Sequence, residues 1–363
     1  VPESLAQVRA IILWEGEKEE SHPRIYTWEE LILLGADVPD SKLNDVIASQ
    51  RANQCCAIFY TKDDPRGVML SHDNLTWVSQ ASCERLVLDE QLVLVSYLPL
   101  HTVSVQLTDL WIPLCCGGTT YFAEEDALKG SLIPTLQEVQ PTWFVGPNHF
   151  WEKIRSIWTA LEHKARLLPR MIIGWARGIG LKAFQNVRPG SVPWGYSLAK
   201  KLVFQPARAA LGLGRCRLGS FGTEPVNLDT LEYYGSLDLL ILARYGVNES
   251  CGIHSVALPN AWKKRSSGLE IPGCKTRLQE PLSQGSGQLC LWGRHIFMGY
   301  LGMEKETQAA LDENGWLLTG ALGRTDKDGF LYVTERGEGS HIRTFSTGET
   351  PRRLQTEDLY MEI

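Results

Sequence analysis

The stretch "CCAIFYTKDDPRGVMLSHDNLTWVSQASCERL", residues 55–86, indicates the fold class. Its first part, "CCAIFYT", is short and rich in apolar and β-forming side chains, which predicts a strand. After Ser71, "DNLTWVSQASCERL" predicts a helix. Short β-rich runs then alternate with helical periods, and this alternation is typical of a mostly parallel sheet with helices on both faces. The predicted fold class is therefore α/β.

The same reasoning predicts further elements along the chain. The predicted strands are "RAIILW", "LVLVSYLPL", "TTYFA", "TWFVG" and "LDLLILARYG". A helix is predicted at "TWEELILLG", and another at "SVQLTDLWIPLCC", which Gly117 and Gly118 would end because glycine readily adopts the left-handed conformation. A helix over residues 148–163 would bury one apolar face, formed by Phe150, Ile154, Ile157, Trp158 and Leu161.

A smaller, strand-rich unit is predicted after residue 255. "GQLCLW" predicts a strand, "KETQAALDENG" a short helix ending at Gly315, and "TDKDGFLYVTER" a hairpin with Asp328 and Gly329 in its turn. These patterns divide the chain into an α/β core at 1–255, a strand-rich remainder at 256–336 and a divergent tail at 337–363.

The composition is that of a globular protein. Hydrophobic residues make up 44% and charged residues 21%, and the formal net charge of −6 gives no electrostatic reason to expect nucleic acid as a partner. The basic triplet Lys263, Lys264 and Arg265 lies beside Ser266 and Ser267, which favours a solvated loop over a binding patch.

Cysteine usage and hydropathy bear on location. The nine cysteines are odd in number, lack C-x-x-C spacing and fall mainly in apolar runs, which indicates reduced thiols. No apolar run approaches the roughly 18 residues that span a bilayer, and no signal-peptide layout opens the chain. We expect a cytoplasmic protein, with peripheral membrane association left open. Because Val1 is not a methionine, we also expect a piece of a longer protein.

Several stretches together resemble one enzyme family. They are "VMLSHDN", "YLPL", "QLTDLW", "FWEKI", "GQLCLWGRHIFMGYLGMEKETQAALDENGWL" and "GRTDKDGFLYVT". The chain from about residue 50 to residue 334 is thereby similar to the adenylate-forming acyl-CoA synthetases, and especially to the bubblegum type of long-chain fatty-acid–CoA ligase. The resemblance implies a large α/β domain that binds ATP, followed by a mobile C-terminal subdomain, which we expect to be missing here.

The resemblance implies a triphosphate loop before "VMLSHDN". Thr61, Arg66 and Gly67 match its flanks, whereas Lys62, Asp63 and Asp64 replace its glycine- and threonine-rich centre. Backbone N–H groups between glycines and a cation make such a loop bind phosphate. Two like charges about 4 Å apart at an effective dielectric constant near 20 repel by about 4 kcal/mol, so the aspartates should weaken ATP binding. The alternative for residues 62–64 is a plain surface turn.

Two further stretches are implied to bind the nucleotide. In "FGTEP", Gly222, Thr223, Glu224 and Pro225 match a small-residue loop beside the adenine. In "RYGVNES", the implied roles are adenine stacking by Tyr245, a tight backbone at Gly246, a polar phosphate contact by Asn248 and Mg²⁺ coordination by Glu249. For "RYGVNES" alone, the alternative is a turn after a strand with an exposed glutamate.

Other matched positions depart from the family pattern. Ala321 stands where the family has an aspartate that accepts hydrogen bonds from the ribose, a loss of about 1.5–3 kcal/mol. Arg336 matches the hinge arginine and is the last nucleotide contact that the resemblance implies. His101 stands at a serine position and Thr102 at a pocket-histidine position, and we expect His101 to be an ordinary core or loop histidine.

The resemblance implies a ligase that uses ATP, Mg²⁺ and CoA. A long-chain fatty acid would form an acyl-adenylate with release of pyrophosphate, and CoA would then take the acyl group as a thioester. The substitutions predict weak or absent activity, because several nucleotide contacts change together. Two alternatives remain open: a non-catalytic relative that binds acyl chains or a protein partner, and a partial gene product without a function of its own.

Overall fold

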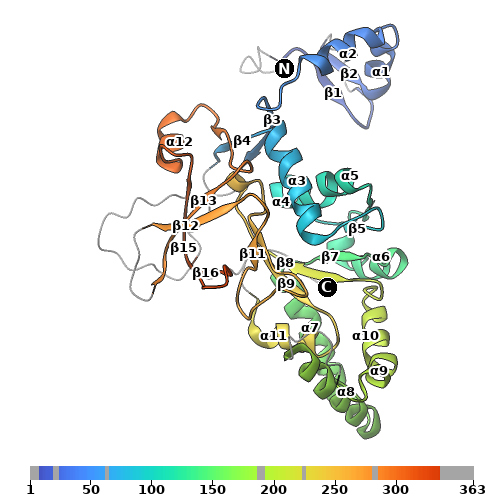
Figure 1. The fold of residues 1–363 in the computed structure, drawn as a ribbon. Coiled ribbons are helices and arrows are strands. Elements are labelled where there is room, and N and C mark those ends of the chain that lie inside the picture. Colours follow the sequence, from blue (N-terminus) through green and yellow to red (C-terminus); the bar gives the residue numbers. More distant parts are fainter. Residues whose placement is uncertain are drawn as a thin grey trace. The chain divides into compact units, whose positions relative to one another are not determined.

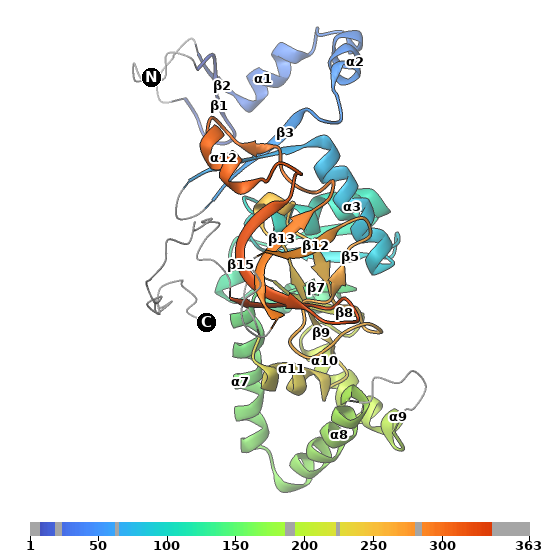
Figure 2. The ribbon, with the colours of Figure 1, turned by 60° about the vertical axis from the view of Figure 1, so that its left-hand side comes forward.

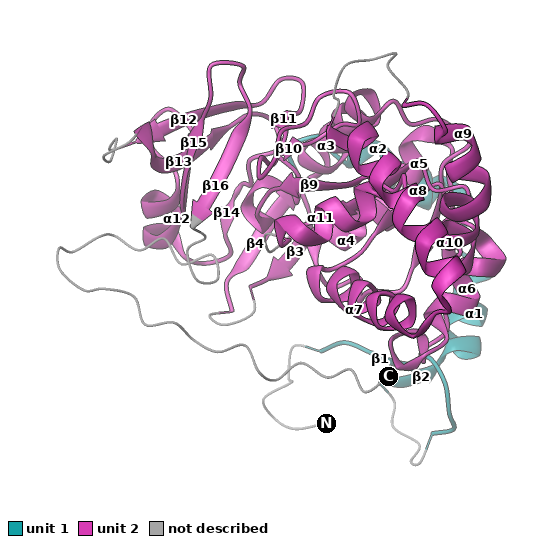
Figure 3. Cartoon of the chain, turned by 90° about the horizontal axis from the view of Figure 1, so that it is seen from below, with its two compact units in different colours: residues 1–54 teal, residues 55–363 magenta. Residues whose placement is uncertain are grey.

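A computed structural model describes residues 8–18, 24–61, 65–185, 193–222, 226–279 and 285–335. Contacts divide the chain into two compact units, residues 1–54 and residues 55–363, which Figure 3 distinguishes by colour. The domain boundaries predicted at residues 255 and 336 stay predictions.

The first unit is small. Strands β1 (Ile11–Leu13) and β2 (Ile25–Thr27) pair in parallel, and helices α1 (Trp28–Gly35) and α2 (Asp40–Ser49) follow. Thr27 caps α1 because its hydroxyl accepts from the N–H of Glu30, while the Glu30 carboxylate accepts from the N–H of Thr27. The strand in "RAIILW" and the helix in "TWEELILLG" are confirmed.

The second unit is built around a five-stranded sheet (Figure 1). Its order is β11 (Leu269–Glu270), β10 (Ser255–Val256), β9 (Ile241–Tyr245), β8 (Leu218–Phe221) and β7 (Trp143–Val145). The last three strands are parallel, whereas β10 and β11 pair antiparallel.

Helices cover both faces of the parallel strands. Successive strand residues point to opposite faces, and Trp143 and Leu242 pack in one core cluster while Phe144 and Ile241 pack in another. The first cluster contains α3 (His72–Leu86) and α5 (Ile112–Cys116), and the second contains residues of the helices numbered α6 to α11, such as Tyr234. The predicted α/β class is confirmed.

Three smaller sheets complete the second unit. Strands β3 (Cys55–Tyr60) and β4 (Gly67–Ser71) form an antiparallel hairpin, and β14 (Gly299–Tyr300) joins it beside β4. Strands β5 (Val93–Ser96) and β6 (Thr119–Phe122) pair in parallel.

The strands near the C-terminal end form an antiparallel sheet, which Figure 2 shows from another side. Its order is β12 (Lys275–Gln279), β13 (Gly287–Trp292), β15 (Leu317–Thr325) and β16 (Leu331–Glu335). The hairpin predicted in "TDKDGFLYVTER" is confirmed, with Gly329 at φ 83° in its turn.

Two helix predictions around the first core are confirmed in their essentials. Ser71 caps α3 by accepting from the N–H of Asn74, and the Asn74 side chain accepts from the N–H of Ser71. The helix predicted in "SVQLTDLWIPLCC" runs as α4 (Val103–Gln106), a π-helical turn η2 (Leu107–Trp111) and α5, and Gly117 at φ 74° ends it.

The remaining helices complete the list, and two of them correct predictions. They are η3 (Ala127–Lys129), α6 (Leu132–Val139), α7 (Asn148–Lys164), α8 (Leu167–Gln185), α9 (Tyr196–Ala199), η4 (Lys200–Phe204), α10 (Gln205–Ala210), α11 (Leu228–Gly235), η5 (Asn248–Ser250) and α12 (Glu304–Ala310). The predicted end at Gly315 is wrong, because α12 ends at Ala310. The predicted burial of α7 is also wrong in part, because Ile157 and Leu161 are exposed.

Candidate functional site

The turn between β3 and β4 joins two of the predicted phosphate-binding residues. The N–H of Thr61 donates to the carbonyl of Arg66 at 3.2 Å, and the N–H of Arg66 donates to the Thr61 hydroxyl at 3.0 Å. The turn therefore closes on itself at its base. Lys62, Asp63 and Asp64, which carry the predicted charge repulsion, lie outside the described residues.

Gly67 packs closely against its neighbours. A Cβ at this position would lie 3.1 Å from both Ile58 Cγ2 and Leu301 Cβ. The carbonyl of Gly67 accepts from the N–H of Leu301 at 2.8 Å, which places β14 beside the base of the turn. Tyr300 thereby comes next to Arg66. The guanidinium of Arg66 lies 5.5 Å from the centroid of the Tyr300 ring.

The two other predicted stretches follow neighbouring parallel strands. Gly222 comes directly after β8, and Tyr245 ends β9, so both lie at the carboxyl edge of the sheet, where α/β proteins bind ligands. A Cβ at Gly222 would lie 3.3 Å from Arg244 Nε. Thr223, Glu224 and Pro225 lie outside the described residues.

The "RYGVNES" residues are mostly enclosed. Tyr245 is 2% exposed, so its ring is packed into the core rather than presented to solvent. Gly246 has no room for a side chain, because a Cβ would lie 2.5 Å from the carbonyl oxygen of Gly252. Asn248 is half-buried and begins η5, in which its carbonyl accepts from the N–H of Cys251.

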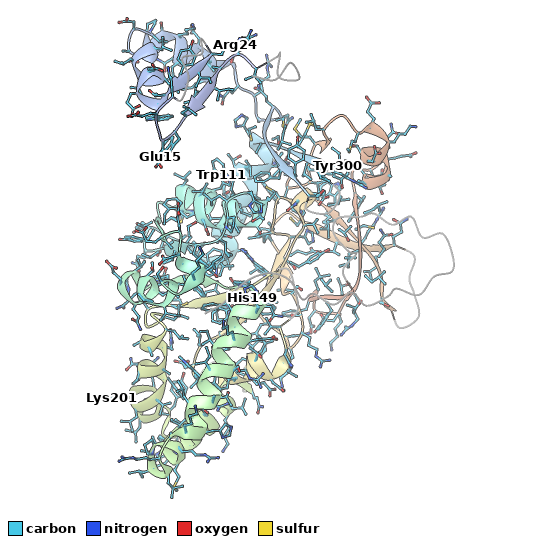
Figure 4. The ribbon with its side chains drawn as sticks, turned by 180° about the vertical axis from the view of Figure 1, so that it is seen from behind. Glu15, Arg24, Trp111, His149, Lys201 and Tyr300 are labelled. Carbon is cyan, nitrogen blue, oxygen red and sulfur yellow. The ribbon has the colours of Figure 1, made fainter. Side chains whose placement is uncertain are left out.

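Glu249 is the centre of the candidate site. The side chain is buried, and the Tyr300 hydroxyl donates to its Oε1 at 2.7 Å. Burial raises the pKa of Glu249, whereas the Tyr300 hydrogen bond and the charge of Arg66 act in the opposite direction. The alternative considered from the sequence alone was a turn after a strand with an exposed glutamate. It is wrong, because Glu249 is buried. Figure 4 labels Tyr300 on β14, beside the β3–β4 hairpin.

The donor set fits Mg²⁺ to a limited extent. Mg²⁺ prefers oxygen ligands and is often held by one or two carboxylates together with substrate phosphates. Glu249 supplies one such carboxylate, and Arg66 lies on the same side of the molecule to meet phosphate oxygens. Among the described residues, Glu249 is the carboxylate that this cluster offers.

Sequence reasoning missed Tyr300. The stretch "FMGYLG" supported the family resemblance but gave Tyr300 no role, because the residue lies 51 positions from Glu249. The pairing of β14 with β4, opposite Val68 and Met69, creates the contact. No local pattern in the sequence signals this pairing.

A second buried polar cluster lies near Gly222 and was also missed. Arg244 donates to the Thr108 hydroxyl at 2.7 Å, and the charge of Asp109 on η2 also acts on its guanidinium. Burial raises the pKa of Asp109 to about 6 and lowers the pKa of Arg244 to about 10. These side chains line a cavity of about 10 Å³, at the lower limit for one water molecule and too small for an acyl chain.

The other positions singled out from the sequence are Ala321, His101, Thr102 and Arg336, and each lies in a different segment from Glu249. Ala321 is buried on β15, and its N–H donates to the Thr319 hydroxyl at 3.1 Å. His101 is exposed, in agreement with a loop histidine, and Thr102 precedes α4. Arg336 lies outside the described residues.

The chain matches the AMP-binding enzyme family over residues 6–301. It belongs to this family. The long-chain-fatty-acid–CoA ligase ACSBG2 of Xenopus laevis is 44% identical over 371 residues, which cover 100% of this chain and 50% of the relative. The human long-chain-fatty-acid–CoA ligase ACSBG1 is 40% identical over 342 residues, covering 92% of this chain and 47% of the relative. The sequence resemblance to bubblegum-type ligases is thereby confirmed.

Two solved structures share the fold of this chain. The o-succinylbenzoate CoA synthetase MenE of Bacillus subtilis superposes with a TM-score of 0.59 at 18% identity, covering 79% of this chain and 50% of that chain. Apo MatB of Rhodopseudomonas palustris gives a TM-score of 0.59 at 21% identity, covering 82% of this chain and 52% of that chain. This AMP-binding enzyme chain spans about half the length of the curated relatives it matches.

Proposed function

We propose that this chain is the ATP-binding part of an AMP-forming long-chain fatty-acid–CoA ligase, and that its own use of ATP is weak. In the proposed reaction, a carboxylate oxygen of the fatty acid attacks the α-phosphorus of ATP and pyrophosphate leaves. The thiol of CoA then attacks the acyl carbon, loses its proton, and AMP leaves. The buried Glu249 carboxylate beside Arg66 and the β3–β4 turn is the observation that carries this proposal.

The proposed nucleotide contacts are distributed over four segments. The proposed residues are Thr61, Arg66, Gly67, Gly222, Thr223, Glu224, Pro225, Tyr245, Gly246, Asn248 and Arg336, with Glu249 as the Mg²⁺ ligand. Those in the described part lie at the β3–β4 turn and at the carboxyl ends of β8 and β9. This placement supports a shared ligand, because segments distant in the sequence converge there.

Weak use of ATP follows from two departures from the family pattern. Asp63 and Asp64 add negative charge to the turn that should meet phosphate, at a cost of about 4 kcal/mol for one such repulsion. Ala321 supplies a methyl group instead of a hydrogen-bond acceptor, at a further cost of about 1.5–3 kcal/mol. Together they approach the roughly 8 kcal/mol that micromolar binding represents.

Fatty-acid-dependent exchange of pyrophosphate into ATP tests the proposal. We expect a low rate from the chain as it stands. A variant that replaces residues 62–64 by the family loop and carries Ala321→Asp should gain exchange and Mg²⁺-dependent ATP affinity. Fast exchange by the unaltered chain would contradict the proposal that its use of ATP is weak. A repaired variant that binds ATP no better would contradict the nucleotide site itself.

A surface on α8 supports a second proposal, the peripheral membrane association that the sequence left open. Leu167, Leu168, Met171, Ile172 and Trp175 are all exposed and follow helical spacing on one side of α8. A Cβ at Gly195 would lie 3.3 Å from Trp175, so the segment before α9 adds its neighbour Trp194, which is 93% exposed. Isolated exposed apolar residues are common, but a continuous set indicates a binding surface.

Charge around this surface favours an anionic lipid bilayer as its occupant. Residues 163–223 contain 11 lysines and arginines and no aspartate or glutamate. Glu162 and Asp238 pair with Arg177, Lys200 and Arg208. Among the described residues of this region, the exposed cations are Lys164, Arg166, Arg170, Lys182, Lys201, Arg215 and Arg217, and Figure 4 labels Lys201. An amphipathic helix with basic and apolar faces lies in the interface of such membranes.

We propose that this part of the chain binds membranes from one side. Within the described residues, every helix is too short or too polar to cross a bilayer. Sedimentation with vesicles of phosphatidylcholine, with and without phosphatidylserine, tests the idea. We expect binding that needs the anionic lipid and weakens with salt. Met171→Glu should weaken it about tenfold, whereas Leu114→Glu, at an exposed site on α5, should not. No binding, or equal loss in both variants, would exclude a lipid occupant.

A further inference from the structure

Three potential metal ligands meet in the buried interior of the second unit. His254 lies between η5 and β10, Cys274 follows β11, and His295 follows β13. The Nδ1 atom of His254 lies 2.9 Å from Nε2 of His295, and the Sγ atom of Cys274 lies 3.5 Å from the same Nε2. All three side chains are buried. Neither the family resemblance nor the proposed ATP site gives them a role.

Two of the distances between the donor atoms can be compared with those of a tetrahedral centre. Zinc bonds to nitrogen are about 2.0–2.1 Å long, and zinc bonds to sulfur are about 2.3 Å long. At a tetrahedral angle, two nitrogen ligands therefore lie about 3.3 Å apart, and a nitrogen and a sulfur ligand lie about 3.6 Å apart. The Sγ atom of Cys274 lies 3.5 Å from Nε2 of His295 and 3.4 Å from its Nδ1, so the imidazole has to rotate before Nε2 and the thiolate can share one ion. The two nitrogens also need to move apart by a few tenths of an ångström. Two imidazoles and a thiolate are the donors that Zn²⁺ prefers.

Neighbouring groups orient the first imidazole. The Nε2 atom of His254 lies 2.8 Å from the Thr276 hydroxyl, and this contact leaves Nδ1 directed toward His295. Metal-binding histidines are commonly held by such a hydrogen bond on the other ring nitrogen, which fixes the tautomer. The N–H of Thr276 in turn donates to the Glu270 carboxylate at 2.6 Å, so the orienting residue is itself anchored.

The backbone leaves space for the second imidazole. Gly293 has φ 151°, and a Cβ there would lie 2.8 Å from His295 Nδ1. The Trp77 ring lies 5.9 Å from the His295 ring, and a Cβ at Gly273 would lie 2.8 Å from the Trp77 ring. Gly273 beside Cys274 and Gly293 two residues before His295 therefore allow the histidine and tryptophan rings to pack here.

The two imidazoles are in the form that binds metals, whereas the Cys274 thiol is not. Burial lowers the pKa of His254 and lowers that of His295 to about 3, so both rings are neutral, which is the form that binds metals. Burial and the nearby Glu270 raise the pKa of Cys274, so the thiol holds its proton until a cation displaces it.

We propose that His254, Cys274 and His295 form a buried site for a borderline-soft divalent cation, with Zn²⁺ as the ion of choice. The ion would connect the segments around β10, β11 and the end of β13, directly after the loop that carries Glu249. The competing interpretation is a chain of hydrogen bonds from Thr276 through His254 to His295 without any ion.

Metal content and a cobalt spectrum test the site on the whole 363-residue chain. We expect elemental analysis to find about one zinc per chain after loading and dialysis. Added Co²⁺ should give tetrahedral visible bands and a near-ultraviolet thiolate band, and zinc removal should lower the melting temperature.

Variants separate the site from general thiol chemistry. Cys274→Ser should abolish the thiolate band and weaken zinc at least tenfold, whereas Cys290→Ser, at another buried cysteine, should keep both. If Cys274→Ser does not fold, the cobalt spectrum of the unaltered chain decides. A folded chain that holds no zinc after loading and gives only an octahedral cobalt spectrum would leave the hydrogen-bonded chain as the correct interpretation.

Discussion

The hydroxyl of Tyr300 donates a hydrogen bond of 2.7 Å to the carboxylate of Glu249, across 51 residues of sequence. Both side chains are buried, and Arg66 faces the same Tyr300 ring. The contact joins β14, the β3–β4 turn and the loop after β9 into one cluster. A buried carboxylate is unstable without such a partner, so this hydrogen bond should stabilise the fold as well as position Glu249.

Tyr300→Phe removes the hydroxyl and keeps the ring. We expect the free energy of unfolding to fall by about 1.5–3 kcal/mol, because the carboxylate loses a charge-assisted hydrogen bond. Urea denaturation at neutral pH measures this. Tyr332→Phe is the control, since its longer 3.3 Å contact to Asp326 is only partly buried and should contribute less than about 1 kcal/mol. Equal losses in the two variants would show that Glu249 does not depend on Tyr300.

Glu249 should also make stability depend on pH. Its pKa is raised above 4.5 in the folded chain, so between 4.5 and the raised value the folded state binds more protons than the unfolded state. The contribution of Glu249 to stability therefore falls as pH rises through that window. Glu249→Gln should lack this decline and gain stability relative to the unaltered chain as pH increases. Denaturation midpoints at several pH values measure the difference, and parallel curves would contradict the raised pKa.

Asp109 and Arg244 are buried opposite charges that line the same small cavity, and their attraction should contribute more to stability than an exposed ion pair. Asp109→Asn leaves the Arg244 guanidinium buried without an opposing charge, at an expected cost of about 3–5 kcal/mol. The double variant with Arg244→Met should recover part of this loss. Glu232→Gln, which breaks the exposed pair with Lys264, should cost less than about 1 kcal/mol. A double variant no more stable than Asp109→Asn would contradict the pairing.

Gly246 should not tolerate a methyl group. A Cβ there would lie 2.5 Å from the Gly252 carbonyl oxygen, so Gly246→Ala forces the backbone of the Glu249 loop to move, at a cost of about 1–3 kcal/mol. In contrast, Gly178→Ala on α8 meets no atom within 4 Å and should stabilise the chain by up to about 1 kcal/mol. Thermal unfolding of the two variants should therefore shift in opposite directions, and a shift of Gly246→Ala to higher temperature would contradict the packing.

Sequence reasoning predicted the regular elements well where local chemistry specifies them. Ser71 with Asn74 starts α3, and Gly117 ends α5, because caps act within a few residues. The end of α12 at Ala310 was missed, because the chain leaves the helix for an extended Leu311 that pairs with Leu317. The exposure of Ile157 and Leu161 was missed as well, because helical periodicity does not tell whether anything covers an apolar face.

The sequence by itself determined the fold class, the family and the stretches that the nucleotide-site proposal uses, because strand–helix alternation and short motifs are local in the chain. The sequence also contains the basic run at residues 163–223, which is not apparent from the net charge of −6 for the whole chain. Tertiary structure decided which side chains meet. Tyr300 contacts Glu249, Arg244 contacts Thr108, and His254, Cys274 and His295 converge, each through strand or helix pairings between distant segments. Burial in those contacts, rather than residue type, sets the charge state of the groups.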